Sequence, residues 1–248
     1  MNPVLMGVLL FITIAFFSLS MFRRILPLLV MQPDIRWDKP GSRIVTMIKY
    51  AVGQLRFFRR FELWHGLAHV LIFWGFLAVS INTIHLVGRG FVPNWSIPGL
   101  HGTTPGLAYA FIKDLFVLAV MIGTLGALFR RVILKPERMT LSWEANLILV
   151  WIFVMMVLDV LYSSTLFILF PDNPEQKTAF MGVIGMNIMK GFGLGNASET
   201  TLFLHSMGLW GHVALVFAFL NYLPYGKHFH VILSLPGVFA GNPEKNGE

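Results

Sequence analysis

Five long apolar runs dominate this sequence, at about residues 3–22, 61–87, 108–129, 143–170 and 202–223. A helix needs about 20 apolar residues to cross a bilayer, and inside lipid its backbone polar groups must be bonded within the segment. Only 12% of the residues are charged, against about 25% in soluble domains. We therefore predict an all-α integral membrane protein, a bundle of five transmembrane helices that forms a single domain over residues 1–248.

The positively charged side chains predict how this bundle is oriented. Fifteen of the nineteen lysines and arginines lie in segments that would share one face, at residues 23–60, residues 130–138 and the tail after the last run. Short loops rich in lysine and arginine stay in the cytoplasm. We therefore predict an outside N-terminus and a cytoplasmic C-terminus, in a multi-pass protein of a prokaryotic cytoplasmic (inner) membrane. Because topology accounts for the charge, we expect no nucleic-acid partner.

Local signals define several smaller segments. Residues 3–22 carry their positive charges after the apolar run, from Arg23 onward, so we predict a retained anchor and not a cleaved signal peptide. Residues 41–60 mix basic and apolar side chains, which predicts an interfacial amphipathic stretch. The glycine-rich apolar segment 178–195 predicts a short surface helix or a lid. Pro224 is expected to end the last span, since proline cannot continue a helix.

Histidines are the side chains best suited to chemistry in this bundle. An imidazole in a membrane needs a partner or a function, and neutral imidazole is a common axial ligand of haem iron. Two helices that share a haem must each offer a histidine at the same depth, and His69 and His230 meet this condition near the cytoplasmic side. His205 and His212 are seven residues apart, so they share one face of the last span. For each histidine the alternative is a hydrogen-bonded core residue.

Two stretches around these histidines resemble a known family. A Phe-Trp-Gly-Phe sequence follows His69, and two histidines stand eighteen residues apart at His212 and His230, with a proline-aromatic break between them. These stretches resemble the second and last spans of respiratory nitrate reductase gamma subunits. A closer resemblance, over about residues 60–240, is to the membrane domains of heterodisulfide-reductase-like electron carriers. Those include DsrM-like subunits and electron-transfer-flavoprotein:menaquinone oxidoreductases, so the resemblance implies a membrane cytochrome b.

This resemblance implies a haem b held by His69 and His230. It also implies that His212 is a ligand of a second, distal haem, but the position of its family partner, ten residues after His69, is Val79 here. Two other histidines could replace that partner, namely His85 and His205. Three alternatives therefore stay open: one haem, a distal haem with rearranged ligands, or His212 in a quinone site.

The predicted function is electron transfer. The chain has no cysteine, so it cannot itself bind an iron–sulfur cluster through thiolates. The resemblance implies a cytoplasmic iron–sulfur partner of the heterodisulfide-reductase type, expected as a separate polypeptide. We expect the chain to pass electrons, as a haem b subunit, between this partner and menaquinone or another quinone, with the direction of flow left open.

Carboxylates and rival functions complete the sequence-based expectations. Asp159, inside the fourth apolar run, is a candidate for proton transfer at a quinone site, the alternative being a buried carboxyl bonded to a neighbouring helix. Lys113 and Asp114 predict an interfacial ion pair. One rival function is a transporter that uses the histidines as relays, although the sequence lacks matched, charge-bearing broken helices. The other is a cofactor-free membrane anchor for a peripheral enzyme.

Overall fold

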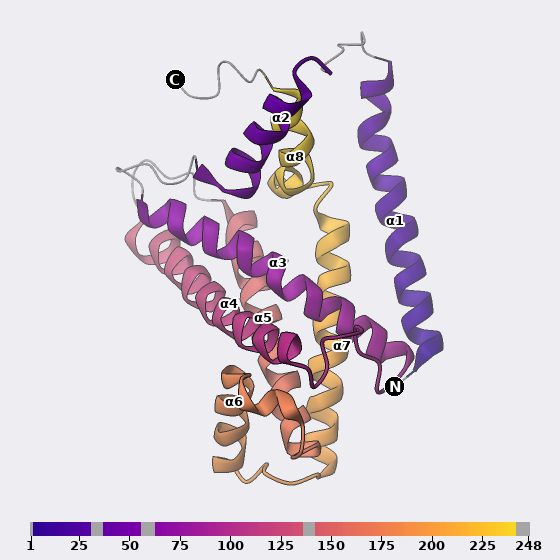
Figure 1. Ribbon diagram of the computed structural model, residues 1–248, viewed down its shortest axis with the longest axis vertical. Helices are drawn as coiled ribbons and strands as arrows, with labels where there is room; N and C mark the ends of the chain where they lie inside the picture. The colour runs from indigo at the N-terminus through magenta and orange to yellow at the C-terminus, as the bar shows by residue number, and fades with distance from the viewer. Residues whose placement is uncertain (1, 31–36, 56–62, 136–141, 242–248) are drawn as a thin grey trace. The chain divides into compact units, whose positions relative to one another are not determined.

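The computed structural model describes residues 2–30, 37–55, 63–135 and 142–241, and every regular element in these ranges is a helix (Figure 1). Five helices are long and apolar enough to cross a membrane: α1 (Pro3–Leu29), α3 (Leu63–Phe91), α4 (Thr104–Phe129), α5 (Trp143–Leu169) and α7 (Glu199–Tyr222). Three shorter helices accompany them: α2 (Pro40–Met47), α6 (Phe180–Gly191) and α8 (His230–Ala240). The predicted all-α membrane fold with five spans is confirmed, and each span overlaps its predicted range.

Local sequence signals determine where these helices begin and end. Helix α4 starts after Thr103, whose Oγ1 accepts the N–H of Gly106 at 3.2 Å, because a hydroxyl at this position satisfies an N–H group that the helix leaves unbonded. Helix α7 ends at Tyr222, two residues before Pro224, as predicted. The chain then turns, and α8 begins at His230. The proline break therefore decides where this histidine enters the fold.

The internal contacts divide the chain into two compact units. The first consists of Met1–Leu10 and Leu71–Phe217, and it contains α4, α5, α6 and most of α3 and α7. The second consists of Phe11–Val70 and Ala218–Glu248, and it contains α2, α8, most of α1 and the first turns of α3. The single domain expected from the sequence stays a prediction.

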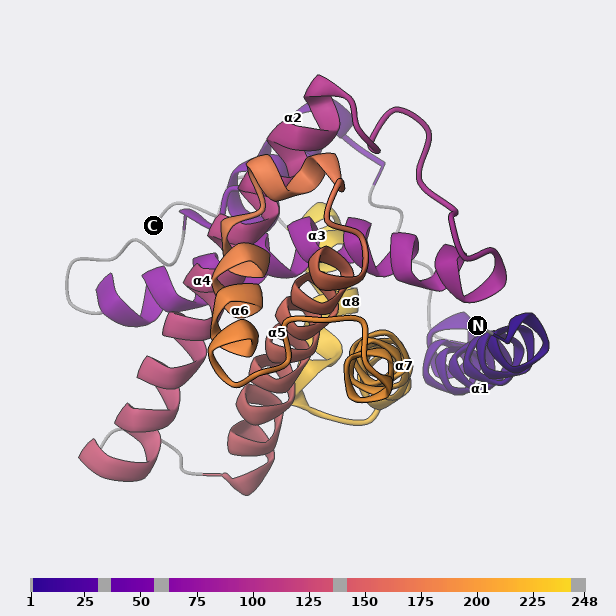
Figure 2. The same ribbon diagram turned by 90° about the horizontal axis from the view of Figure 1, so that it is seen from below.

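In the first unit, α5 lies at the centre of the helix contacts. It contacts α4 and α6, and the three helices lie side by side in Figures 1 and 2. The core contains Leu86 from α3, Phe167 from α5 and Leu209 from α7, none of them more than 2% exposed. The segment predicted as a short surface helix or lid, residues 178–195, forms α6.

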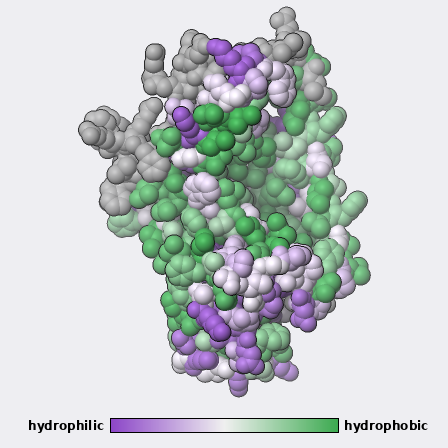
Figure 3. All heavy atoms as spheres, viewed as in Figure 1, coloured by the Kyte–Doolittle hydropathy of each residue, from purple (hydrophilic) through white to green (hydrophobic). Residues whose placement is uncertain are grey.

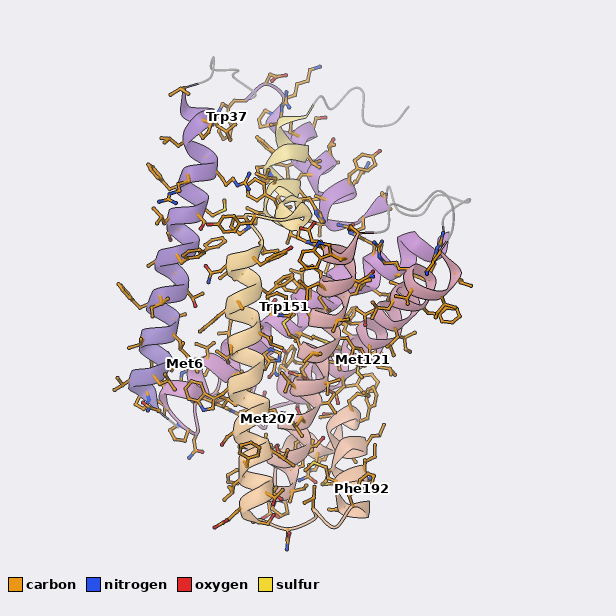
Figure 4. All side chains as sticks on the ribbon, turned by 180° about the vertical axis from the view of Figure 1, so that it is seen from behind. Met6, Trp37, Met121, Trp151, Phe192 and Met207 are labelled. Carbon is orange, nitrogen blue, oxygen red and sulfur yellow. The ribbon has the colours of Figure 1, made fainter. Side chains whose placement is uncertain are left out.

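Helix α7 approaches α5 closely in this unit. A Cβ atom added to Gly208 would lie 2.8 Å from the backbone nitrogen of Tyr162, so a residue without a side chain is required at this crossing. Further along the same two helices, Nε1 of Trp151 donates to the Leu215 carbonyl at 3.1 Å (Figure 4). A close backbone approach and a side-chain hydrogen bond thus hold the pair together.

In the second unit, a buried arginine joins α2 to α8. Arg43 is only 2% exposed, and its Nη1 donates to the carbonyls of Phe239 at 3.0 Å and Gly241 at 2.6 Å. Its Nη2 donates to Oδ1 of Asp38 at 2.7 Å. The last carbonyls of a helix have no partner within the helix, so Arg43 caps the end of α8. The predicted amphipathic stretch 41–60 is helical in its first half, and its last five residues lie outside the described ranges.

Exposed apolar side chains cover the spanning helices. Ile122 and Phe129 of α4 are 62% and 55% exposed, and Phe11 of α1 is 73% exposed. Figure 3 shows apolar residues, in green, over much of the face seen in that view. Such large exposed apolar areas are unusual on a protein in water, and they are what lipid-facing helices present.

Candidate functional site

Within the second unit, the structure brings His69 and His230 together. His69 lies in the second turn of α3 and is half-buried, whereas His230 is the exposed first residue of α8. Their ring centroids are 6.3 Å apart, and the ring planes meet at 35°. The two histidines that the sequence singled out therefore face each other, while their role as ligands stays a prediction.

The segment between α7 and α8 positions His230. A short 3₁₀ turn, Lys227–Phe229, leads directly into α8, and the ring of His228 lies 6.0 Å from that of His230. The hydroxyls of Ser20 in α1 and Tyr225, which lies two residues before this turn, are 2.7 Å apart and share a hydrogen bond. This contact ties the segment before the turn to α1, a few residues before His230.

The distance between the two rings fits a shared haem iron. A metal–imidazole bond is about 2 Å long, so two imidazoles on opposite sides of one iron have ring centroids roughly 6 Å apart. Haem iron takes its axial ligands from one or two side chains. In the described part of the chain, no group of three or more His, Cys, Asp or Glu residues could hold a metal ion. The ring separation is thus compatible with two imidazoles sharing one iron, and the haem itself stays a prediction.

His212, in the first unit, has a different environment. It is 1% exposed, and its Nδ1 lies 3.2 Å from the Met155 carbonyl while its Nε2 lies 3.0 Å from Oγ1 of Thr83. A carbonyl only accepts hydrogen bonds, so Nδ1 donates to Met155, while Nε2 shares a hydrogen bond with the threonine hydroxyl. Both ring nitrogens are thus bonded to the protein, as expected for a core histidine.

His205 and His85 also lie in the first unit, and each contacts an aromatic ring. His205 stacks on Tyr162 with centroids 4.6 Å apart, and its Nδ1 lies 3.0 Å from Oγ1 of Thr165. His85 meets Trp95 edge-on, with centroids 5.7 Å apart. It is 6% exposed, and its Nε2 has no hydrogen-bond partner among the described residues. Neither ring contacts another histidine ring there.

Asp159 forms the centre of a buried charge cluster that joins three helices of the first unit. Its Oδ1 accepts from Nδ2 of Asn82 in α3 at 2.5 Å, and its Oδ2 accepts from Nζ of Lys113 in α4 at 2.7 Å. Lys113 also pairs with Asp114 Oδ1 at 2.9 Å, and Asp114 Oδ2 accepts from the first N–H groups of α6. The sequence predicts an interfacial pair of Lys113 and Asp114. Both are instead buried, because partners from α5 and α6 surround them.

Sequence reasoning missed three cationic residues that the structure makes central. Lys113 is the partner of Asp159, Arg89 donates from Nη1 to the Tyr162 hydroxyl at 2.7 Å, and Arg43 caps α8. Arg43 and Arg89 were counted only as charges that indicate topology, and Lys113 was expected only to pair with Asp114 at the interface. Lys113 lies within an apolar run and Arg89 two residues after one. A charge at such a position needs a buried partner, and that signal could have identified both.

Comparisons with known proteins add two distant relatives. No family model matches the chain, and no solved structure matches it. It is 26% identical over 183 residues to a probable iron–sulfur-binding oxidoreductase, FadF, of Bacillus subtilis (strain 168), covering 74% of this chain and 25% of that protein. It is 23% identical over 243 residues to the EtfAB:quinone oxidoreductase of Syntrophomonas wolfei subsp. wolfei (strain DSM 2245B / Goettingen), covering 93% of this chain and 32% of that protein.

These relatives agree with part of the resemblance found in the sequence. The chain spans about a quarter to a third of the length of the curated relatives it matches. One of them is named as an EtfAB:quinone oxidoreductase, and the other as a probable iron–sulfur-binding oxidoreductase. The likeness to nitrate reductase gamma subunits stays a resemblance. The chain, with its five membrane-spanning helices, is a distant relative of quinone- and iron–sulfur-related oxidoreductases.

Proposed function

We propose that this chain is the haem b subunit of a membrane-bound quinone oxidoreductase and passes electrons between iron–sulfur clusters and a quinone such as menaquinone. The observation that carries the proposal is the pair of histidine rings, His69 and His230, with centroids 6.3 Å apart. The names of the two relatives supply the quinone and the iron–sulfur chemistry. When bound, a haem supplies the capacity to take up and release one electron.

The residues around the pair would hold the haem and limit its chemistry. His69 from α3 and His230 from α8 would hold the haem iron, and the haem would supply one-electron transfer. Arg43 holds the end of α8 through the Phe239 and Gly241 carbonyls. The helix that carries His230 is therefore anchored at its far end by a buried guanidinium.

We propose a single haem for this chain. The surroundings of His212 do not fit a second one, because Met155 and Thr83 bond both of its ring nitrogens. The position that holds the partner ligand in the nitrate reductase family is Val79, which is 3% exposed and has no ligand atom. We propose that the quinone-reactive region lies in the first unit. His212 would belong to the polar wall of that region and would not bond the quinone directly, since both of its nitrogens are taken.

The first unit offers what a quinone site requires. Such sites are mostly apolar and carry a few well-placed polar groups for hydrogen bonding. Here His85, His212 and Asp159 are all buried among apolar spanning helices. A membrane quinone would approach this unit from the lipid, and Asp159, held by Lys113, would take part in the accompanying proton transfer from the interior.

The electron partner is proposed to carry iron–sulfur clusters on cysteines outside these 248 residues, since this segment has none. The basic segments at residues 36–60 and 130–138 and the tail are expected to form one cytoplasmic face. Complementary charge accelerates docking of a partner, so an acidic surface on the heterodisulfide-reductase-like iron–sulfur protein is expected to dock there.

Haem content tests the proposal directly. The purified protein should contain about one haem b per chain by the pyridine haemochrome assay, with the spectrum of a six-coordinate, low-spin iron. His69→Ala and His230→Ala should each lose this haem, because one of the two axial ligands is missing. The matched control is His228→Ala, which removes the neighbouring imidazole and should keep the haem. A wild-type protein without haem would instead favour a cofactor-free anchor, and full haem retention in His230→Ala would reject the ligand assignment.

A further inference from the structure

A polar cavity lies in the first unit between α3, α4 and α5, beside the buried charge cluster. Its lining includes His85, Arg89, Tyr109, Lys113, Tyr162 and Glu175. The centres of water-sized spheres can occupy about 30 Å³ of it. One water needs roughly 10–15 Å³ by this measure, so the cavity has room for about two waters and is too small for a quinone ring.

A buried, unbonded nitrogen indicates that this cavity is wet. His85 is 6% exposed, and its Nε2 has no hydrogen-bond partner in the part of the chain that the structure describes. Leaving a buried polar group unbonded costs about 1–3 kcal/mol. Waters in a polar cavity usually satisfy such groups, and here Lys113 and Arg89 offer them further donors.

The cavity wall also holds its donors in fixed positions. Nη1 of Arg89 donates to the Tyr162 hydroxyl at 2.7 Å, and the Tyr109 hydroxyl donates to the Ala78 carbonyl at 3.0 Å. Nζ of Lys113 donates to Oδ2 of Asp159 at 2.7 Å. The hydrogen bonds to the protein fix the positions of these side chains. Waters in the cavity would therefore meet donors and acceptors with fixed orientations.

One end of the cavity reaches the protein surface. Glu175 lines the cavity, and its Oε1 lies 3.3 Å from Nδ1 of His101. The side chain of Glu175 is 20% exposed and that of His101 is 45% exposed. Groups that can exchange protons therefore continue from the surface to His85 and the Lys113–Asp159 pair inside the helices.

We infer that this cavity is a hydrated proton path between His101 and Glu175 at the surface and His85 and the Lys113–Asp159 pair in the interior. The inference rests on the proposed function, because a quinol that is oxidised to a quinone gives up two electrons and two protons, and quinone reduction takes up both. The haem carries the electrons only. The protons need a separate route, since the apolar helices and the lipid around them conduct none.

The water in the cavity is tested without reference to haem or quinone. In hydroxyl-radical labelling by X-ray pulses, bound water makes adjacent side chains reactive even when they are buried. Tyr109 and Tyr162 should label faster than Phe217, which is 8% exposed and lies away from the cavity. His85→Phe keeps an aromatic side chain but removes the ring nitrogens that would bond water. It should therefore slow labelling of both tyrosines. Labelling as slow as at Phe217 would show a dry cavity and overturn the inference, whether or not the protein binds haem.

The proton path is tested by the rate at which a quinol reduces the haem in the purified complex. Glu175→Gln keeps the shape of the side chain but loses the carboxyl group that can exchange a proton. The rate of haem reduction should therefore fall roughly 10- to 100-fold, and its solvent isotope effect should increase. The haem content should stay unchanged. The matched control is Asp172→Asn, an exposed carboxylate of the same loop that does not line the cavity, and it should keep the wild-type rate. An unchanged rate in Glu175→Gln would overturn the path, whereas loss of haem from the wild-type protein would reject the proposed function instead.

Discussion

Replacing Lys113 by methionine should destabilise the fold strongly. Lys113 is 5% exposed and pairs with Asp159 at 2.7 Å and Asp114 at 2.9 Å, which are 0% and 1% exposed. Methionine fills a similar volume but leaves two buried carboxylates without their cation. Removing one partner of a buried ion pair costs about 3–5 kcal/mol, and in a protein of this size that corresponds to a fall in Tm of roughly 6–20 °C.

A double substitution separates the lost charge from the lost packing. In Lys113→Met with Asp159→Asn, one of the two carboxylates is replaced by a neutral amide of similar shape, so part of the lost stability should return, while Asp114 still lacks its cation. The assay is thermal unfolding in detergent, followed by tryptophan fluorescence. Lys190→Met removes an exposed lysine of α6 and should leave Tm within about 1 °C of wild type. The reasoning is refuted if Lys113→Met unfolds at the wild-type temperature, or if the double variant is no more stable than the single one.

Three further predictions concern the helix contacts and the orientation. Gly208→Val places a side chain where a Cβ would already lie 2.8 Å from the Tyr162 nitrogen, so it should cost about 1–3 kcal/mol; an unchanged Tm would contradict the close crossing. Arg43→Gln removes charged donors to the last carbonyls of α8, so deuterium exchange over residues 230–241 should quicken roughly tenfold; unchanged exchange would show that the guanidinium does not hold the helix. In Arg36→Cys, the introduced thiol should not react with a membrane-impermeant maleimide applied outside intact cells. Labelling from the outside would show that the predicted orientation is wrong.

The candidate site was only partly predictable from the sequence. The pairing of His69 with His230 followed from hydropathy, because two positions at the same end of two spans lie at one depth. The partners of Asp159 were not predictable, since which helix faces which depends on rotation about each helix axis. Asn82 and Lys113 stand far from Asp159 along the chain, and only the packing of α3, α4 and α5 brings their side chains within 2.5 and 2.7 Å of its oxygens.

The sequence by itself determined the number of spans, their approximate ends and the proline break before His230, because bilayer thickness and backbone hydrogen bonding leave few choices for an apolar run of this length. It also identified which histidines could share one depth. Only the tertiary structure decided that His212 is bonded on both nitrogens, that Arg43 caps α8, and that a cavity lined by charged side chains lies beside Asp159. Those features depend on contacts between side chains of different helices, and hydropathy, which is a property of each helix alone, carries no information about them.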